Sequence, residues 1–216
     1  KNKYYKIDSS GKKIKISKEK YLTCITKKYK NIIVSEPNIE NKIIINIAFP
    51  SINRPKIIEE NIKSLVKYLK GVDFENSKIF MNMDPVPIVS NIEESEKLVK
   101  KYIPNIVINY SKKPSYPKAY LWTLKQCCLN KVESNLLLFL PDDWEFVNYI
   151  NINDVIDKFK NNSDIKSISI NNDWEFGISN LGININKHKK NEKNLFRSTP
   201  SFYLIDFFES VYNKIE

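Results

Sequence analysis

The side chains with the clearest chemical potential are Asp142 and Asp143, which follow the apolar run from Leu136 to Leu140. Such a continuous run predicts a strand buried on both faces, and Pro141 ends it because proline has no N–H for the ladder. Adjacent carboxylates repel each other unless a cation or hydrogen-bond donors hold them. Their oxygens suit Mg²⁺ or Mn²⁺, particularly where a substrate phosphate completes the shell. We therefore expect a metal site for a nucleotide diphosphate here.

These carboxylates can form a binding site only if a sheet brings the carboxyl ends of several strands together. Apolar runs predict strands at residues 43–49, 78–83, 105–110, 136–140, 165–170 and 201–205. Amphipathic or capped segments predict helices at residues 56–70, 90–102, 118–129 and 153–160, and a last helix from residue 206. This alternation favours an α/β domain over residues 43–216, with a doubly wound, mostly parallel sheet. Ligands bind at the carboxyl ends of the strands in such sheets.

Residues 1–42 are expected to form a basic N-terminal extension. Two short alternating runs around Asp8–Gly11 predict a β-hairpin from Tyr4 to Ile16. Ser17 is a candidate cap for a short helix that ends near Leu22. A two-stranded hairpin is marginal by itself, so we expect it to pack on the main domain or on a partner.

Composition narrows the possible partners. Apolar residues make up 42% of the 216 residues, which predicts a folded domain. The formal net charge of +10 fits a phosphorylated or polyanionic partner, and it equally fits a lysine-rich solvated surface. The lysines are spread along the chain without a compact basic tail, so nucleic acid is not an expected partner.

The expected cellular location of the protein rests on membrane-span, signal-peptide and cysteine patterns. No stretch reaches the roughly 18 apolar residues of a membrane span, and no signal peptide starts the chain. Cys24, Cys127 and Cys128 form neither an even disulfide framework nor a zinc-binding pattern. These features favour a soluble, cytoplasmic protein without a membrane span.

A family resemblance rests on three features in order. A first strand runs into Ser51-Ile-Asn-Arg-Pro55, Asp84 closes the second strand, and Leu-Pro-Asp-Asp-Trp-Glu-Phe146 follows the fourth. Together they resemble nucleotide-sugar glycosyltransferases of the GT-A fold, over roughly residues 43–210. The closest likeness is to bacterial and large-DNA-virus members with an Asp-Asp-Trp-Glu-Phe motif. For a viral member, a cytoplasmic location would mean the host cytoplasm or the virion.

The resemblance implies a donor, usually a UDP-sugar, a Mn²⁺ or Mg²⁺ ion, and a glycan, protein or lipid acceptor. It places Asp84 against the base, Lys118 against the base or diphosphate, and Asp142 near the ribose. Asp143 would be the stronger metal ligand of the Asp-x-Asp site, with Asp142 beside it. Pro141 stands where the family often carries an acid, which leaves only two carboxylates. The family also implies a set of residues under the base and ribose: Pro50, Ser51, Asn53 and Arg54.

An inverting transferase needs a carboxylate that deprotonates the acceptor hydroxyl. The candidates are Asp173, Glu175 and Asp206. Asp173 and Glu175 follow a predicted strand and could line an acceptor pocket. Asp206 also fits a capping role at the start of the last helix.

Other interpretations stay open on the sequence alone. Asp142 and Asp143 could cap a turn, and His188 fits either a solvated loop or a lid over the diphosphate. The whole chain could instead be a non-catalytic scaffold or a polyanion-binding module. A nucleotidyltransferase would also use strand-end carboxylates, but the sequence has no glycine-rich phosphate loop.

Overall fold

The computed structural model describes residues 4–7, 13–16, 35–39, 41–86, 92–170, 183–187 and 200–212. The chain divides into two compact units, residues 1–35 and residues 36–216, which we call the N-terminal unit and the main unit. The sequence prediction put this boundary at residue 42. Glu36 belongs to the main unit because its carboxylate accepts hydrogen bonds from Lys70 Nζ at 2.5 Å and from Tyr149 Oη at 3.3 Å.

The N-terminal unit contains the hairpin that the alternating runs predicted. Strands β1 (Tyr4–Ile7) and β2 (Lys13–Ile16) pair antiparallel, with Tyr4 opposite Ile16 and Ile7 opposite Lys13. The helix predicted after Ser17 lies outside the described residues.

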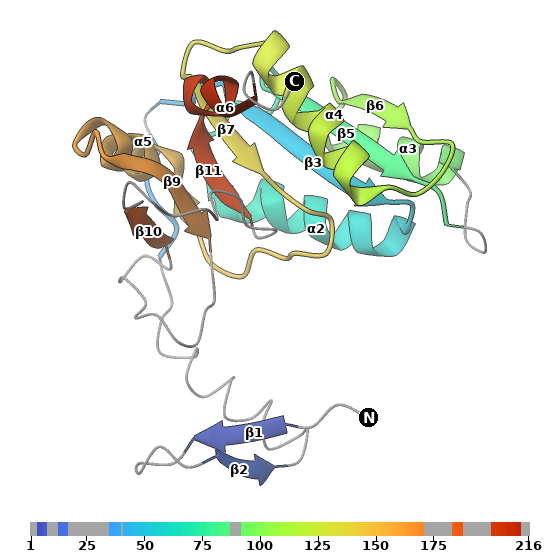
Figure 1. Ribbon diagram of the computed structural model, residues 1–216, viewed down its shortest axis with the longest axis horizontal. Helices are drawn as coiled ribbons and strands as arrows, with labels where there is room; N and C mark the ends of the chain where they lie inside the picture. Colours follow the sequence, from blue (N-terminus) through green and yellow to red (C-terminus); the bar gives the residue numbers. More distant parts are fainter. Residues whose placement is uncertain are drawn as a thin grey trace. The chain divides into compact units, whose positions relative to one another are not determined.

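The described part of the main unit is built on a seven-stranded sheet (Figure 1) in the order β10-β9-β11-β7-β3-β5-β6. Its strands are β3 (Asn46–Ile52), β5 (Lys78–Asp84), β6 (Val107–Tyr110), β7 (Leu136–Phe139), β9 (Ile165–Ile170), β10 (Ile183–Lys187) and β11 (Ser201–Leu204). Strands β6, β5, β3 and β7 are parallel neighbours, whereas β11 is antiparallel to both β7 and β9. The prediction of a mostly parallel sheet is confirmed.

Helices cover both faces of the sheet (Figure 1), with α4 and α6 on one face and α2 on the other. The helices are α2 (Pro55–Tyr68), α3 (Ile92–Tyr102), α4 (Tyr116–Leu129), α5 (Ile152–Lys160) and α6 (Ile205–Tyr212). Short strands β4 (Leu69–Lys70) and β8 (Ile150–Asn151), which the sequence did not predict, pair in parallel as a separate two-stranded sheet.

The core explains why the apolar runs became central strands. Alternate residues of β3 point to opposite faces, so Ile47 packs with the helix α2 side chains and Ala48 packs with α4. Leu137 and Leu138 of β7 divide between the same two clusters, and every residue of β7 is buried. Burial on both faces is what a continuous apolar run predicts. The sheet therefore presents the carboxyl ends of β3, β5 and β7 as one rigid edge.

Candidate functional site

A cavity of about 570 Å³ opens at the carboxyl ends of β3, β5 and β7. Six residues predicted from the sequence line it: Pro50, Ser51, Arg54, Asp84, Asp142 and Asp143. Seven other residues line the cavity that were not predicted as site residues: Ile52, Pro114, Ser115, Tyr116, Ala119, Pro141 and Trp144. The parallel pairing of β3 with both neighbours is what brings residues so distant in sequence to one place.

Asp142 is a buried carboxylate that the end of β3 holds in place. Its Oδ2 accepts hydrogen bonds from Ser51 Oγ at 3.0 Å and from the Ile52 N–H at 2.9 Å. Its Oδ1 accepts from Arg54 Nη2 at 3.0 Å, which is also an ion pair. The guanidinium offsets the charge of this carboxylate. Asp142 therefore joins the loop after β7 to the loop after β3, and much of its capacity as an acceptor is already used.

Asp84 is a second buried carboxylate, 3% exposed, on the wall of the cavity. Its Oδ1 accepts from Asn82 Nδ2 at 3.0 Å, and its Oδ2 accepts from the Ser115 N–H at 2.8 Å. Ser115 is the residue before helix α4, so Asp84 meets the positive end of that helix. These donors fix the carboxylate in one orientation while a ligand could still approach its remaining lone pairs.

Asp143 differs from Asp84 and Asp142 because its side chain is exposed. Within the described part of the chain, no hydrogen bond or ion pair holds its carboxylate. Tyr116, about half exposed, lies on the same cavity, and partial burial together with the charges of Asp143 and Asp142 raises the pKa of its phenol. The cavity thus carries one unengaged carboxylate and a phenol that stays protonated at neutral pH.

Helix α2 holds the loop that carries both aspartates. Asn61 Nδ2 donates to the carbonyl oxygens of Pro141 at 3.1 Å and Trp144 at 2.6 Å. Ser64 Oγ accepts from the Phe146 N–H at 2.9 Å and donates to the Asn61 carbonyl at 2.8 Å. Both side chains are buried. Neither residue was predicted from the sequence, although two polar residues on the apolar face of an amphipathic helix are a signal for such a role.

Two residues predicted to contact the nucleotide do not line this cavity. Asn53 is fully buried: its side chain accepts from Ser95 Oγ at 2.5 Å, and its backbone N–H donates to the Asp84 carbonyl at 2.8 Å. Lys118 is exposed in the first turn of α4. In this geometry Asn53 ties the end of β3 to α3 and β5.

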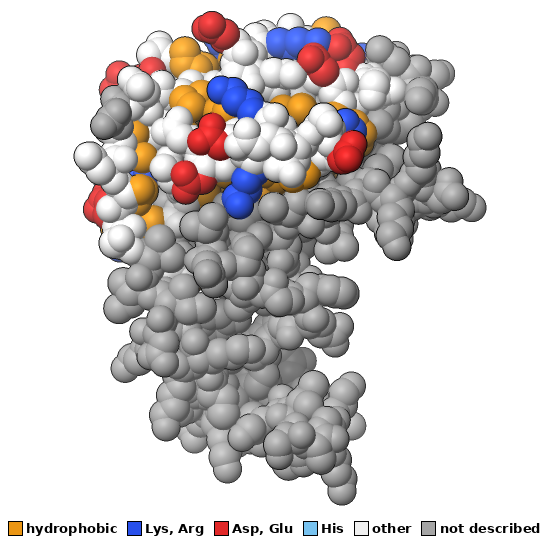
Figure 2. Space-filling view, turned by 90° about the vertical axis from the view of Figure 1, so that its left-hand side faces the viewer, with side chains coloured by type: hydrophobic (Ala, Val, Ile, Leu, Met, Phe, Trp, Pro, Cys, Tyr) orange, Lys and Arg blue, Asp and Glu red, His pale blue; other side chains and the backbone are white. Residues whose placement is uncertain are grey.

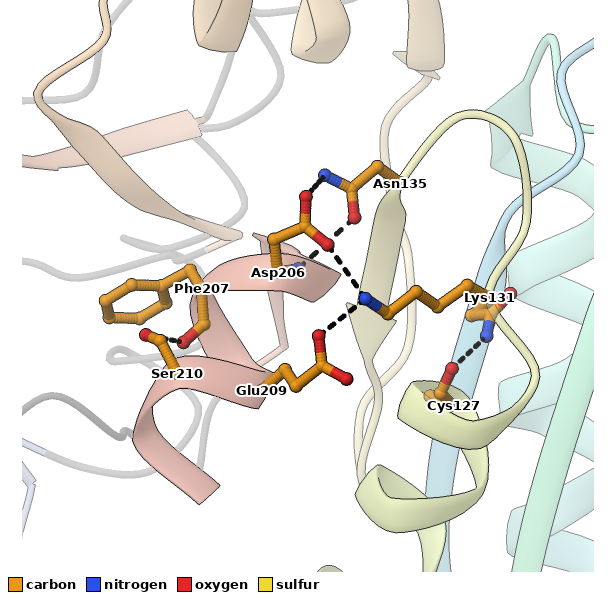
Figure 3. A network of polar contacts seen from close by, with 8 residues as sticks. Cys127, Lys131, Asn135, Asp206, Phe207, Glu209 and Ser210 are labelled. Atoms are coloured by element: carbon orange, nitrogen blue, oxygen red, sulfur yellow. Dashed lines mark hydrogen bonds and ion pairs between the residues drawn. The ribbon is translucent and has the colours of Figure 1, made fainter. Parts of the chain in front are cut away.

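Asp206, a predicted candidate for the catalytic base, lies near the opposite end of β7 from the cavity. Leu204 pairs with Leu136, the first residue of β7, whereas Asp142 follows the last. The Asp206 carboxylate accepts from Lys131 Nζ at 3.0 Å and from Asn135 Nδ2 at 2.9 Å (Figure 3). The alternative interpretation, a structural residue at the start of α6, agrees with these contacts. Asp173, Glu175 and His188 lie outside the described residues.

The carboxylates of the cavity limit which of its residues could bind the expected metal ion. In the parts of the chain that the structure describes, no group of three or more His, Cys, Asp or Glu side chains could hold a metal. Mg²⁺ and Mn²⁺ sites in nucleotide enzymes often use one or two carboxylates, with substrate phosphates and water as the other ligands. Asp143 fits such a site, and Asp142 fits it less well because Arg54 already offsets its charge.

Solved structures share this fold. The mannosyltransferase PcManGT from Pyrobaculum calidifontis, in complex with GDP-Man and Mn²⁺, aligns with a TM-score of 0.50 and 8% identity, over 88% of this chain and 53% of its own. The fold is GT-A-like. No family model matches the sequence, and no curated protein matches it.

Two further solved structures have lower TM-scores. S. aureus TarS aligns at 0.41 with 18% identity, over 58% of this chain and 34% of that one. The 4-diphosphocytidyl-2C-methyl-D-erythritol synthase from Anaerococcus prevotii aligns at 0.44 with 15% identity, over 82% and 76%. The chain therefore spans about a third of the TarS structure and about half of the mannosyltransferase. At these identities the likeness concerns the GT-A-like fold alone.

The described residues include no helix long and apolar enough to cross a membrane.

Proposed function

We propose that the chain is a metal-dependent glycosyltransferase. It moves a sugar from a nucleotide-sugar donor to a glycan, protein or lipid acceptor, and the proposed donor is a UDP-sugar. The observation that carries the proposal is the cavity at the carboxyl ends of β3, β5 and β7. It combines the unengaged Asp143 carboxylate with two fixed carboxylates, Asp84 and Asp142, in a GT-A-like fold. Ligands of α/β sheets bind at this edge.

The residues divide between recognition and support. Asp84 would accept a hydrogen bond from the nucleotide base, and Asn82 and Ser115 set the orientation of its carboxylate. Arg54 gives one Nη2 hydrogen bond to Asp142, so further N–H donors of its guanidinium can meet the ribose or a phosphate. Asp142 supports the site by fixing Arg54 and the loop after β7.

The diphosphate is the leaving group, and its growing negative charge must be stabilised. A divalent ion at Asp143 would supply that stabilisation as a Lewis acid, with the donor phosphates among its ligands. Asp143 would hold the ion, and the loop anchored by Asn61 and Ser64 holds Asp143 at the cavity. Asp173 and Glu175 stay the candidate bases for an inverting reaction.

The test is a thermal-shift panel of UDP, GDP, CDP and their sugars, each with and without Mn²⁺. A nucleotide at about 100 times its Kd stabilises the folded state by about 2.7 kcal/mol, which is a shift of several degrees for a domain of this size. We expect one nucleotide to give this shift, with Mn²⁺ required.

Asp143→Asn should abolish the Mn²⁺-dependent part of the shift while leaving the unliganded melting temperature unchanged, because the side chain is exposed. Asp164→Asn, at an exposed aspartate outside the cavity lining, is the matched control and should keep the full shift. If no nucleotide stabilises the protein, the transferase proposal is wrong and the non-catalytic scaffold becomes the better interpretation.

A further inference from the structure

The net charge of the protein is unevenly divided between its two units. Lysines are denser in the N-terminal unit than in the main unit, and acids are sparser there. Residues 1–35 contain eleven lysines against only Asp8 and Glu19, a net charge of +9. Residues 36–216 contain 24 Lys and Arg against 23 Asp and Glu, a net charge of +1. Almost the whole excess therefore belongs to the smaller unit.

The main unit has the mixed surface expected of its nearly neutral charge. Figure 2 shows acidic and basic side chains interspersed over the described part of the face it presents. Several of its lysines are paired, as in Lys63 with Glu59, Lys100 with Glu96 and Lys131 with Glu209. A surface of this kind gives no long-range attraction to a polyanion.

The hairpin of the N-terminal unit combines cations with apolar residues. In the backbone register of the ribbon, Tyr5 lies opposite Lys15 and Ile7 lies opposite Lys13. Lys15 is exposed. Along the unit, the lysines are interleaved with six isoleucines and four tyrosines. A unit of 35 residues is too small to bury many apolar side chains by itself, and its single cysteine, Cys24, cannot form an internal disulfide.

We propose that the N-terminal unit docks the protein onto an anionic phospholipid surface. Clusters of lysines are attracted to anionic headgroups by about 1 kcal/mol for each residue near the surface. Tyrosine favours the membrane–water interface, and isoleucine favours its apolar side. The attachment is peripheral and would hold the main unit, with its cavity, near acceptors at that surface.

The residue types of the N-terminal unit favour a lipid surface over nucleic acid as its partner. All eleven cations of the unit are lysines, which act as hydrated point charges and suit a diffuse field of headgroups. Sequence-specific readers of nucleic acid rely on the bidentate geometry of arginine, and single-strand binders rely on stacked aromatic rings. The unit has no arginine, and its apolar residues are mainly aliphatic, with four tyrosines but no Phe or Trp.

Vesicle sedimentation of the full chain tests the proposal. The vesicles are phosphatidylcholine alone or about three parts phosphatidylcholine to one part phosphatidylserine, at low salt. We expect binding only to the anionic vesicles, with release as salt is raised from about 0.05 M to about 0.5 M, because the Debye length shortens.

Two triple variants locate the attraction. Lys12→Gln, Lys13→Gln and Lys15→Gln together should weaken partitioning at least about tenfold, and Lys27→Gln, Lys28→Gln and Lys30→Gln should do the same. The matched control replaces three exposed lysines of the main unit, Lys78, Lys97 and Lys160, by glutamine, and should change partitioning less than about twofold. The nucleotide-induced thermal shift should be unchanged in all three, which separates this proposal from the proposed function.

Three results would contradict docking to lipid. Equal binding to neutral and anionic vesicles would remove the electrostatic basis. An equal loss in the control would place the attraction outside the N-terminal unit. Tighter binding to single- or double-stranded DNA, at the same phosphate concentration, would identify nucleic acid as the partner instead.

Discussion

At the scale of single residues, the three carboxylates of the cavity have different surroundings and so different roles. Asp142 and Asp84 are buried and each accepts from fixed donors, whereas Asp143 is exposed and unengaged in the described structure. Adjacent aspartates in the sequence are thus not equivalent ligands. One fixes the loop, and its neighbour is available to a ligand.

The Asp142–Arg54 pair gives a prediction on stability. Asp142→Asn should lower the free energy of unfolding by about 2–4 kcal/mol, because an amide N–H₂ replaces an acceptor among three donors. Arg54→Gln should cost less, about 1 kcal/mol, since Arg54 is 35% exposed. Urea unfolding of both single variants and the double variant measures the coupling. If the two effects simply add, the ion pair does not hold the loop.

At the scale of elements, helix α2 is the support of the loop after β7. Asn61→Ala removes two hydrogen bonds to buried carbonyls, and we expect a loss of about 1–3 kcal/mol in stability together with weaker nucleotide binding. Glu60→Ala, at the adjacent exposed position, is the control and should change neither quantity. Unfolding curves and the Mn²⁺-dependent thermal shift report the two effects. Unchanged nucleotide binding in a destabilised Asn61→Ala protein would show that the anchor does not position the site.

Helix α6 begins against β7 through Asn135, which has a left-handed backbone with φ of 54°. The Asn135 carbonyl accepts from the Ile205 N–H at 2.9 Å, and its side chain accepts from the Asp206 N–H at 3.2 Å. It thus satisfies N–H groups at the helix start that have no partner within α6.

Asn135→Ala should therefore cost about 1–3 kcal/mol, because it loses these side-chain contacts and strains the backbone. Asn135→Gly should cost about 1 kcal/mol less, since glycine tolerates positive φ. Chemical denaturation of the two variants compares them, and equal losses would mean that backbone strain plays no part.

At the scale of the whole molecule, the main unit contains the complete sheet and both core clusters. A protein of residues 36–216 should therefore fold and keep the nucleotide-induced thermal shift. Its net charge falls from +10 to +1, so it should elute from a cation exchanger at low salt near neutral pH, where the full chain is retained. Circular dichroism and ion-exchange elution check the two statements, and an unfolded product would show that the core needs the first 35 residues.

The sequence alone determined the succession of strands and helices in the main unit, because burial on both faces and amphipathic spacing leave local patterns. It also determined that Asp84, Asp142 and Asp143 lie at or just after strand ends, and six of the predicted residues line one cavity. Strand β10 and the short strands β4 and β8 left no such pattern, since pairing with distant residues creates them.

Tertiary structure decided which side chains share a space. The antiparallel course of β11 sends Asp206 to the edge opposite Asp142, a direction that no local pattern encodes. Likewise, only the packing of α2 under the loop after β7 makes Asn61 and Ser64 part of the site. Element types follow from short-range periodicity, whereas strand direction and loop anchoring depend on contacts between residues far apart in the chain.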